Sequence, residues 1–214
     1  MRVQTTKDVL EEKDIVDILL NHEQRFLPRV EKLKRYYAGE HDILKKEQRA
    51  DSAPNNMIVA NYCEYIANMS AGFFMGQPVA YSSVSGDADA VRALQDVFRY
   101  NDEAECNLRL AGEAGITGAA YEVLYLDADA AIRFCPLPSE QMILVTDATL
   151  EENLIAAIRC RRLYELDGVS YHDYVEVYDA QCVTGYDYSG GTLTRRTEAV
   201  PHYFDGVPVI EYPN

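Results

Sequence analysis

Four aspartates are the residues of this chain whose type and spacing come closest to a catalytic arrangement. Asp87 and Asp89 form one pair, Asp127 and Asp129 another, and clustered carboxylates can hold a divalent cation that activates water. The second pair flanks a turn without further ligands at EF-hand spacing, and Asp87 stands where a helix N-cap is expected. We interpret these residues as turn formers and a cap. A metal-dependent carboxylate hydrolase stays as an alternative hypothesis, which loss of activity in Asp→Asn variants would support.

No other group of residues points to catalysis. The motifs GxxxxGK[ST], GxSxG and HExxH are absent, and the four histidines (22, 41, 172 and 202) are scattered through unlike segments. His41 should lie in a loop, and His172 and Asp173 should point to opposite faces of a strand. Five cysteines without a CxxC pair indicate reduced thiols and no zinc site. The sequence therefore predicts no enzyme, no cofactor and no metal site.

Tyrosine is abundant, with 16 residues against no tryptophan. One group could form a stacking surface on a sheet: Tyr171, Tyr174, Tyr178, Tyr186 and Tyr188. An aromatic sheet without basic neighbours is a poor platform for RNA, so we expect these rings to pack in a core.

The charge of the chain is unevenly distributed. The whole chain carries a net −15, but residues 1–50 hold 11 basic and 10 acidic side chains, and residues 51–214 contain no lysine. The locally basic segment is 25–49, which is either a solvated helix face or a surface that docks on an acidic neighbour. Proteins that grip nucleic acid need the opposite balance, so affinity-driven DNA binding is disfavoured. No apolar run is long enough for a membrane span, and the N-terminus lacks an apolar signal core.

Apolar periodicity predicts that the first half of the chain is helical. Helices are expected over 8–22, 24–38, 88–100 and 102–118, with Leu108, Ala111 and Ile116 buried in the last. Small residues at 112, 114 and 115 should allow the last two helices to pair tightly and lean on a central one. A polar loop is expected over 44–53.

Alternating patterns predict strands after residue 118. They are expected over 121–126, 131–135, 141–146, 154–163, 171–178, 181–186 and 207–212, with turns at Asp167-Gly168 and Ser189-Gly190-Gly191. The fold class is therefore α+β, with a helical part (1–118) around one long central helix and an antiparallel β-rich part (119–214).

The central helix is expected in the stretch 54–83. After the turn residues Pro54, Asn55 and Asn56, apolar side chains recur at helical spacing, and Gly76 and Pro78 end the helix before an extended, β-favouring run over 79–83. The predicted buried stripe consists of Ile58, Tyr62, Ile66, Met69 and Phe73, widened by Val59, Cys63 and Ser70. Phe73 and Phe74 should close the helix against the β-rich part, so truncating Phe73 should cost about 3–5 kcal/mol.

Two ordered strings in this region resemble the signature elements of bacteriophage portal proteins, in the class from tailed phages of Gram-positive hosts. The first is similar to Tyr-Tyr-x-Gly-x-His-x-Ile and comprises Tyr36, Tyr37, Gly39, His41 and Ile43. The second joins an Asn-Asn-x-Ile-Val-x-Asn-Tyr helix to an aromatic-Gly-x-Pro-Val turn, at Asn55, Asn56, Ile58, Val59, Asn61, Tyr62, Phe74, Gly76, Pro78 and Val79. Looser matches lie in 136–141, 171–178 and 206–212.

The resemblance implies a structural role without an active site. Members of the family form a ring, usually of twelve subunits, at one capsid vertex, through which DNA passes without specific binding. The ring docks terminase, scaffold or capsid proteins and head-completion proteins, so the expected location is the virion, and the host cytoplasm during assembly, with no membrane contact. Acidic walls would repel phosphates and let DNA slide.

The resemblance also implies that most of this chain is the wing of a portal subunit. The Val-Pro-Val-Ile-Glu element at 207–211 precedes the stem and clip in the family, so stem, clip and crown are expected to be absent. We therefore expect a monomer or a weak small oligomer, with exposed apolar side chains. A β-type peptide-binding module in residues 120–212 stays as a further alternative, which a pull-down with that half would test.

Overall fold

The computed structural model describes residues 1–47 and 56–214 and divides them into two compact units. Unit 1 combines residues 1–27 with 121–211, and unit 2 combines residues 28–120 with 212–214. One boundary between the units lies at 120/121, and residues 1–27 belong to the unit that contains the larger sheet. Pro54, Asn55 and most of the predicted 44–53 loop lie outside the described residues.

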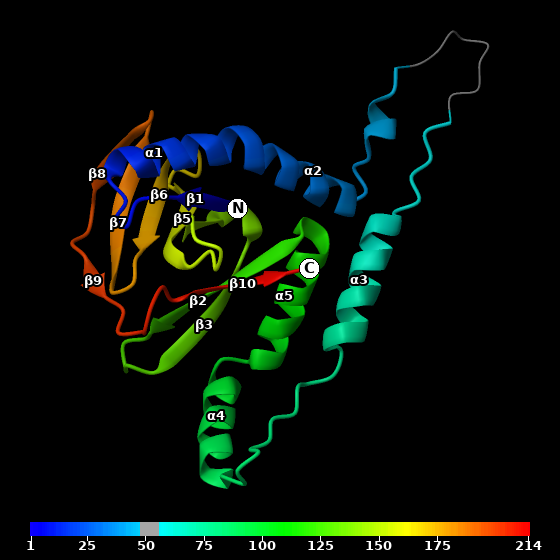
Figure 1. Ribbon diagram of the computed structural model, residues 1–214. Coiled ribbons are helices and arrows are strands. Elements are labelled where there is room, and N and C mark those ends of the chain that lie inside the picture. The colour runs from blue at the N-terminus through cyan, green and yellow to red at the C-terminus, as the bar shows by residue number, and fades with distance from the viewer. Residues whose placement is uncertain (48–55) are drawn as a thin grey trace. The chain divides into compact units, whose positions relative to one another are not determined.

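The α+β fold class is confirmed, and unit 1 contains the larger sheet (Figure 1). Its strand order is β1-β4-β5-β6-β7-β8, with β9 paired to β7. The strands are β1 (Arg2–Thr5), β4 (Met142–Asp147), β5 (Leu154–Tyr164), β6 (Tyr171–Tyr178), β7 (Cys182–Ser189), β8 (Thr192–Arg195) and β9 (Val200–Pro201). All pairs are antiparallel except β1 with β4, which is parallel; β1, β8 and β9 were not predicted.

A second sheet of three strands completes the β structure. Its order is β10-β2-β3, made of β10 (Val209–Pro213), β2 (Ala119–Leu126) and β3 (Ile132–Leu137), with the short helix η3 (Ser139–Gln141) leading into β4. The hairpin between β2 and β3 is the predicted one. Asp127 forms its turn, because its Oδ1 atom accepts hydrogen bonds from the backbone N–H groups of Asp129 and Ala131.

The core of unit 1 lies between the large sheet and helix α1 (Glu12–Asn21), which runs across one face of that sheet (Figure 1). Ile15, Ile18 and Leu19 of α1 are buried, whereas Val9 precedes the helix and is exposed. They pack with Ile143, Val145, Ile158, Val175 and Tyr188 of the sheet. In β4 all of residues 142–145 are buried, so both faces of the sheet are covered at that strand.

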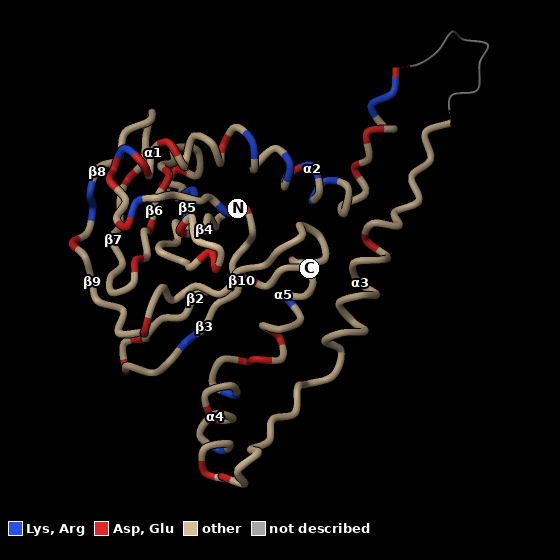
Figure 2. Tube along the Cα trace, in the orientation of Figure 1, with Lys and Arg blue, Asp and Glu red and all other residues tan. Residues whose placement is uncertain are grey.

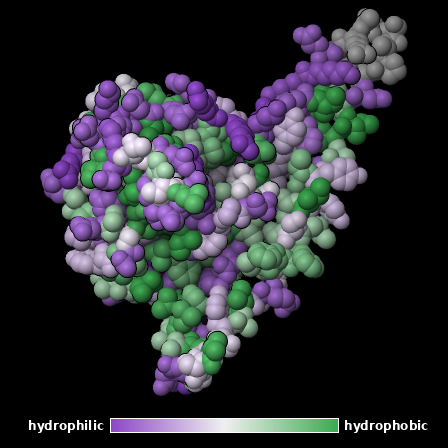
Figure 3. Space-filling model, viewed as in Figure 1, coloured by the Kyte–Doolittle hydropathy of each residue, from purple (hydrophilic) through white to green (hydrophobic). Residues whose placement is uncertain are grey.

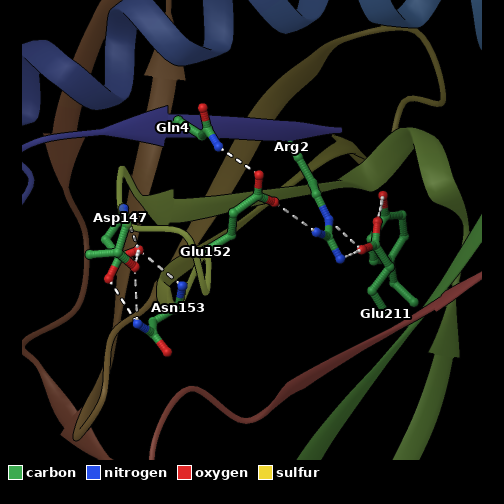
Figure 4. A network of polar contacts seen from close by, with 8 residues as sticks. Arg2, Gln4, Asp147, Glu152, Asn153 and Glu211 are labelled. Carbon is green, nitrogen blue, oxygen red and sulfur yellow. Dashed lines mark hydrogen bonds and ion pairs between the residues drawn. The ribbon is translucent and has the colours of Figure 1, made fainter.

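Polar contacts join β1 to the loop after β4 and to β10 (Figure 4). The Arg2 guanidinium pairs with Glu152 and Glu211, and the Gln4 amide donates a 2.8 Å bond to Glu152. Asp147 accepts hydrogen bonds from the backbone and side chain of Asn153, which closes the loop. These contacts explain how a four-residue strand is held at the sheet edge.

Unit 2 is helical. A π-helical turn, η1 (His22–Phe26), runs from α1 into α2 (Leu27–Tyr37), so the two predicted helices are continuous, and the short helix η2 (Asp42–Lys45) follows. The remaining helices are α3 (Tyr62–Met75), α4 (Ala88–Tyr100) and α5 (Glu103–Thr117). Asp87 caps α4, as predicted, by accepting bonds from the backbone N–H groups of Asp89 and Ala90.

Helix α5 packs against α3 through small side chains. Ala67 and Ala71 are the buried residues of α3, and a Cβ atom at Gly115 of α5 would lie 3.9 Å from that of Ala67. Cys106, Leu110 and Ala114 are the buried residues of α5, so the prediction of a buried Leu108 is wrong; its side chain is exposed. Ala111 and Ile116 are half-buried. The helix pair that forms is α3 with α5.

The predicted buried stripe of the central helix is wrong. Ile58 precedes α3, and its side chain and those of Tyr62, Ile66, Met69 and Phe73 are all exposed, as are Cys63, Ser70 and Phe74. Large apolar side chains therefore point away from α5, while the small ones face it, because only alanine and glycine permit the close approach of the two helices. Residues 79–83 form no strand.

Candidate functional site

The residues first considered for catalysis are not brought into one site. Asp87 and Asp89 belong to the start of α4 in unit 2, while Asp127 and Asp129 form a hairpin turn in unit 1. Across residues 1–47 and 56–214, no group of three or more His, Cys, Asp or Glu side chains is placed to hold a metal ion. All five cysteines are free thiols. The hydrolase hypothesis finds no support in this geometry.

One hollow in unit 1 contains titratable side chains. It is lined by Leu20, Glu23, Tyr171, His172, Asp173, Tyr188 and the turn 189–191. Burial, together with the nearby Asp173 carboxylate, raises the pKa of Glu23. Arg162 pairs with Asp173 at 3.2 Å, so the acidic side of the hollow is already neutralised. Both ring nitrogens of His172 already have partners, since Nδ1 contacts Glu165 and Nε2 contacts Arg196.

The tyrosines of the large sheet divide between core and surface. Tyr178 and Tyr188 are buried, as predicted, but Tyr171 is exposed. The prediction that these rings lack basic neighbours is wrong, because Arg162 lies 4.0 Å from the ring centroid of Tyr171, and Arg161 and Arg196 lie 5.4 and 5.5 Å from that of Tyr174. Sequence reasoning missed these contacts because they depend on strand register.

The arginines beside these rings are already paired with acidic groups. Arg161, Arg162 and Arg196 contact Glu176, Asp173 and Asp187 respectively. A surface on which each of these cations has a carboxylate partner does not present the excess positive charge that phosphate recognition needs.

Residues of the two signature strings meet at one junction between α2 and α3. The Asn61 amide donates a 2.8 Å bond to the Tyr37 carbonyl at the end of α2, while its oxygen accepts from the Glu64 N–H in the first turn of α3. The Tyr37 hydroxyl donates a 2.8 Å bond to Asn68, one turn further along α3. One asparagine thus satisfies backbone groups at the ends of two helices.

The end of α2 has a Schellman geometry that depends on Gly39. The N–H groups of Gly39 and Glu40 donate to the carbonyls of Tyr36 and Arg35, and Gly39 has φ of +81°, which favours glycine. A Cβ at Gly39 would also lie 3.4 Å from the Asn61 amide nitrogen. The glycine therefore lets the chain turn and lets Asn61 approach.

His41 and Tyr36 complete this junction. The His41 ring stacks on Tyr36 with centroids 4.8 Å apart, and its Nε2–H donates a 3.0 Å bond to the Tyr36 carbonyl. The Tyr36 hydroxyl donates to Asp42 and, together with Arg35, lowers the pKa of that carboxyl. We name the group Tyr36, Tyr37, Gly39, His41 and Asn61 the helix junction.

The other signature residues lie away from the helix junction. Asn56 and Ile58 are exposed ahead of α3, Tyr62 opens α3, and Phe74, Gly76, Pro78 and Val79 lie at or beyond its end. Asn55 is outside the described residues. A Cβ at Gly76 would lie 2.1 Å from the Gly72 carbonyl oxygen, so a larger residue there would disturb the end of α3.

The capping role of Asn61 leads to a stability prediction. Asn61→Ala should lower the free energy of unfolding by about 1–2 kcal/mol, because it removes the N-cap of α3 and the bond to α2. Asn61→Ser keeps a capping oxygen but is too short to reach Tyr37, so about half of that loss is expected. Urea titration followed by circular dichroism measures both. Equal stability of the serine variant and the wild type would show that the bond to Tyr37 contributes nothing.

These features fit a structural protein, since the helix junction joins the end of α2 to the start of α3 through hydrogen bonds. Residues 16–214 match the model of the SPP1 Gp6-like phage portal protein family. The match covers nearly the whole chain, so the chain belongs to this family, and the resemblance seen in the sequence is confirmed. No curated protein matches the chain.

Family membership defines a general role. Portal proteins are structural, non-enzymatic virion components, which in general form an oligomeric ring at a capsid vertex. None of the helices in the described ranges is both long and apolar enough to cross a lipid bilayer.

Proposed function

We propose that this chain supplies the wing of a portal subunit, and that twelve subunits form the ring through which phage DNA is packaged and ejected. The ring docks terminase during packaging, contacts scaffold or capsid proteins at the vertex, and later carries head-completion proteins. The observation that carries the proposal is the family match over residues 16–214. It is supported by the helix junction, where Tyr37 and Asn61, one from each signature string and 24 positions apart, are joined by a hydrogen bond.

The charge distribution supports a passive role toward DNA. Residues 51–214 carry 9 basic and 25 acidic side chains, and the basic residues of 25–47 lie mainly on α2 (Figure 2). Some of these cations are held by acidic partners, as Lys34 by Glu113 and Arg35 by Asp42. A surface of this kind repels the phosphate backbone, so DNA can move past it without adhering.

Negative-stain electron microscopy of the purified chain tests the assembly, and co-purification with the terminase of the same phage tests the docking. Ring particles with a central channel would support the twelve-subunit assembly, and a terminase complex recovered at physiological salt would support the docking role. If the terminase does not co-purify with this protein, the docking role is contradicted, but the family membership is unaffected.

The acidic surface also leads to a binding prediction. The chain should show no measurable affinity for duplex DNA near about 0.15 M salt, since its net charge of −15 opposes the phosphate contacts that counterion release requires. Fluorescence polarisation with a labelled duplex, repeated across salt concentrations, checks this. Sub-micromolar binding that weakens as salt rises would contradict it, and Lys32→Glu with Lys34→Glu on α2 would then locate the contact.

A further inference from the structure

The outer face of α3 is a continuous apolar surface. Tyr62, Tyr65, Ile66, Met69 and Phe73 recur at three- and four-residue spacing, which places them on one side of a helix. Their exposed fractions range from 57% for Met69 to 94% for Phe73. We name these five residues the outer stripe. The opposite side of the same helix carries Ala67 and Ala71, which are buried.

The outer stripe is large for a surface that stays in water. At about 200 Å² for each fully exposed side chain of this size, the five residues together expose roughly 700 Å². That area is as large as the largest apolar patches of typical monomers, and approaches the roughly 800 Å² that one partner contributes to a standard interface. Met57 and Ile58, which precede the helix, are exposed as well. Figure 3 shows hydrophobic atoms on the part of the surface where Figure 1 places α3 and the segment before it.

The distribution of charge indicates which molecule covers the outer stripe. From residue 56 to residue 86 the one charged side chain is Glu64, in a chain with a net charge of −15 (Figure 2). Glu64 does not belong to the outer stripe, and its carboxylate accepts a bond from the Asn61 amide. Two copies of so acidic a chain repel each other over most of their surface. The outer stripe contributes no charge of its own to such a contact, so it adds no like-charge repulsion.

We propose that the outer stripe packs against a second copy of this chain and forms a subunit contact of the portal ring. The proposal rests on the proposed function, because a family of ring-forming proteins requires a self-contact. In a ring each contact is head-to-tail, so the stripe of one subunit lies on a different surface of the next. The small residues facing α5 hold the helix in place, and its large apolar residues remain available to the neighbour.

Sedimentation velocity over about 1–200 µM chain tests the proposal, a range that covers the dissociation constants of weak self-contacts. The wild type should gain mass with concentration, and the double variant Ile66→Asp, Phe73→Asp should weaken association by at least about tenfold. The control is Leu166→Asp, which adds the same charge at a fully exposed apolar residue between β5 and β6 and should associate as the wild type does.

The outcomes separate this proposal from the proposed function. If the double variant forms rings as well as the wild type does, the outer stripe is not a subunit contact, and the proposed portal function is unaffected. A wild-type chain that stays monomeric throughout the range also overturns the stripe contact, as does stripe-dependent flotation with neutral phosphatidylcholine vesicles. Far-UV circular dichroism and urea midpoints matching the wild type ensure that the double variant is folded.

Discussion

Replacing Ile158 with alanine is expected to lower the free energy of unfolding by about 2–5 kcal/mol, whereas Ile66→Ala should change it by less than about 0.5 kcal/mol. Ile158 is 0% exposed in the centre of β5, where it packs with α1 and with Ile143 and Val175. Its truncation removes buried methyl groups and leaves a cavity, because the paired strands cannot shift far enough to fill the space. Ile66 is 60% exposed on α3 and leaves no cavity.

Urea titration of both variants at low micromolar concentration checks this contrast, since dilution keeps self-association out of the measurement. The two substitutions are chemically identical, so the difference reports only on the environment of each isoleucine. A loss above about 1.5 kcal/mol for Ile66→Ala would place the outer stripe inside the fold of a single chain. The same reasoning corrects the expectation for Phe73, whose truncation should now cost little.

Helical periodicity predicted which residues of α3 share a face, but not what covers that face. Tyr62, Ile66, Met69 and Phe73 do lie together, as their spacing indicated. A buried stripe and a stripe reserved for another molecule have the same pattern, because both require apolar side chains every three or four residues. The signal that could have decided it is the opposite side, where Ala67 and Ala71 match the small residues of α5.

Pairing between strands that are far apart in the sequence explains why β1 was not predicted. Strand β1 is four residues long and pairs in parallel with β4, about 140 residues away, so nothing in its local sequence specifies its partner. For the same reason residues 1–27 could not be assigned to the β-rich unit. The antiparallel strands β2 to β7 were predictable because each carries its own alternation and is bounded by turn residues.

The helix junction was predictable as a set of residues but not as a geometry. The resemblance drew attention to Tyr36, Tyr37, Gly39, His41 and Asn61 as two separate strings. Their meeting depends on the positive φ of Gly39 and on a hydrogen bond between residues 24 positions apart. Side-chain to backbone bonds across such a distance leave no pattern of spacing in a single sequence.

His22 should make the stability of unit 1 sensitive to mild acid. Its side chain is buried beside Phe26 in the π-helical turn, and burial lowers the pKa of its imidazole from 6.5 to about 4. Between these two values the unfolded chain binds a proton that the folded chain does not, so stability falls as the pH falls through this window. The shift corresponds to roughly 3 kcal/mol of stability, which is fully lost only at pH values below the folded-state pKa.

The variant His22→Phe separates this effect from the acid sensitivity of the carboxylates, which both proteins share. Unfolding titrations at neutral pH and at two lower pH values should show the wild type losing more stability than the variant as the pH falls. Proton NMR of the imidazole gives an independent reading, with an expected pKa near 4. Because the Nε2 atom of His22 has no hydrogen-bond partner among the described residues, nothing there offsets the cost of charging the ring. An imidazole that titrates near its ordinary value, or a difference between the two proteins that stays constant with pH, would show that water reaches the ring in the folded state.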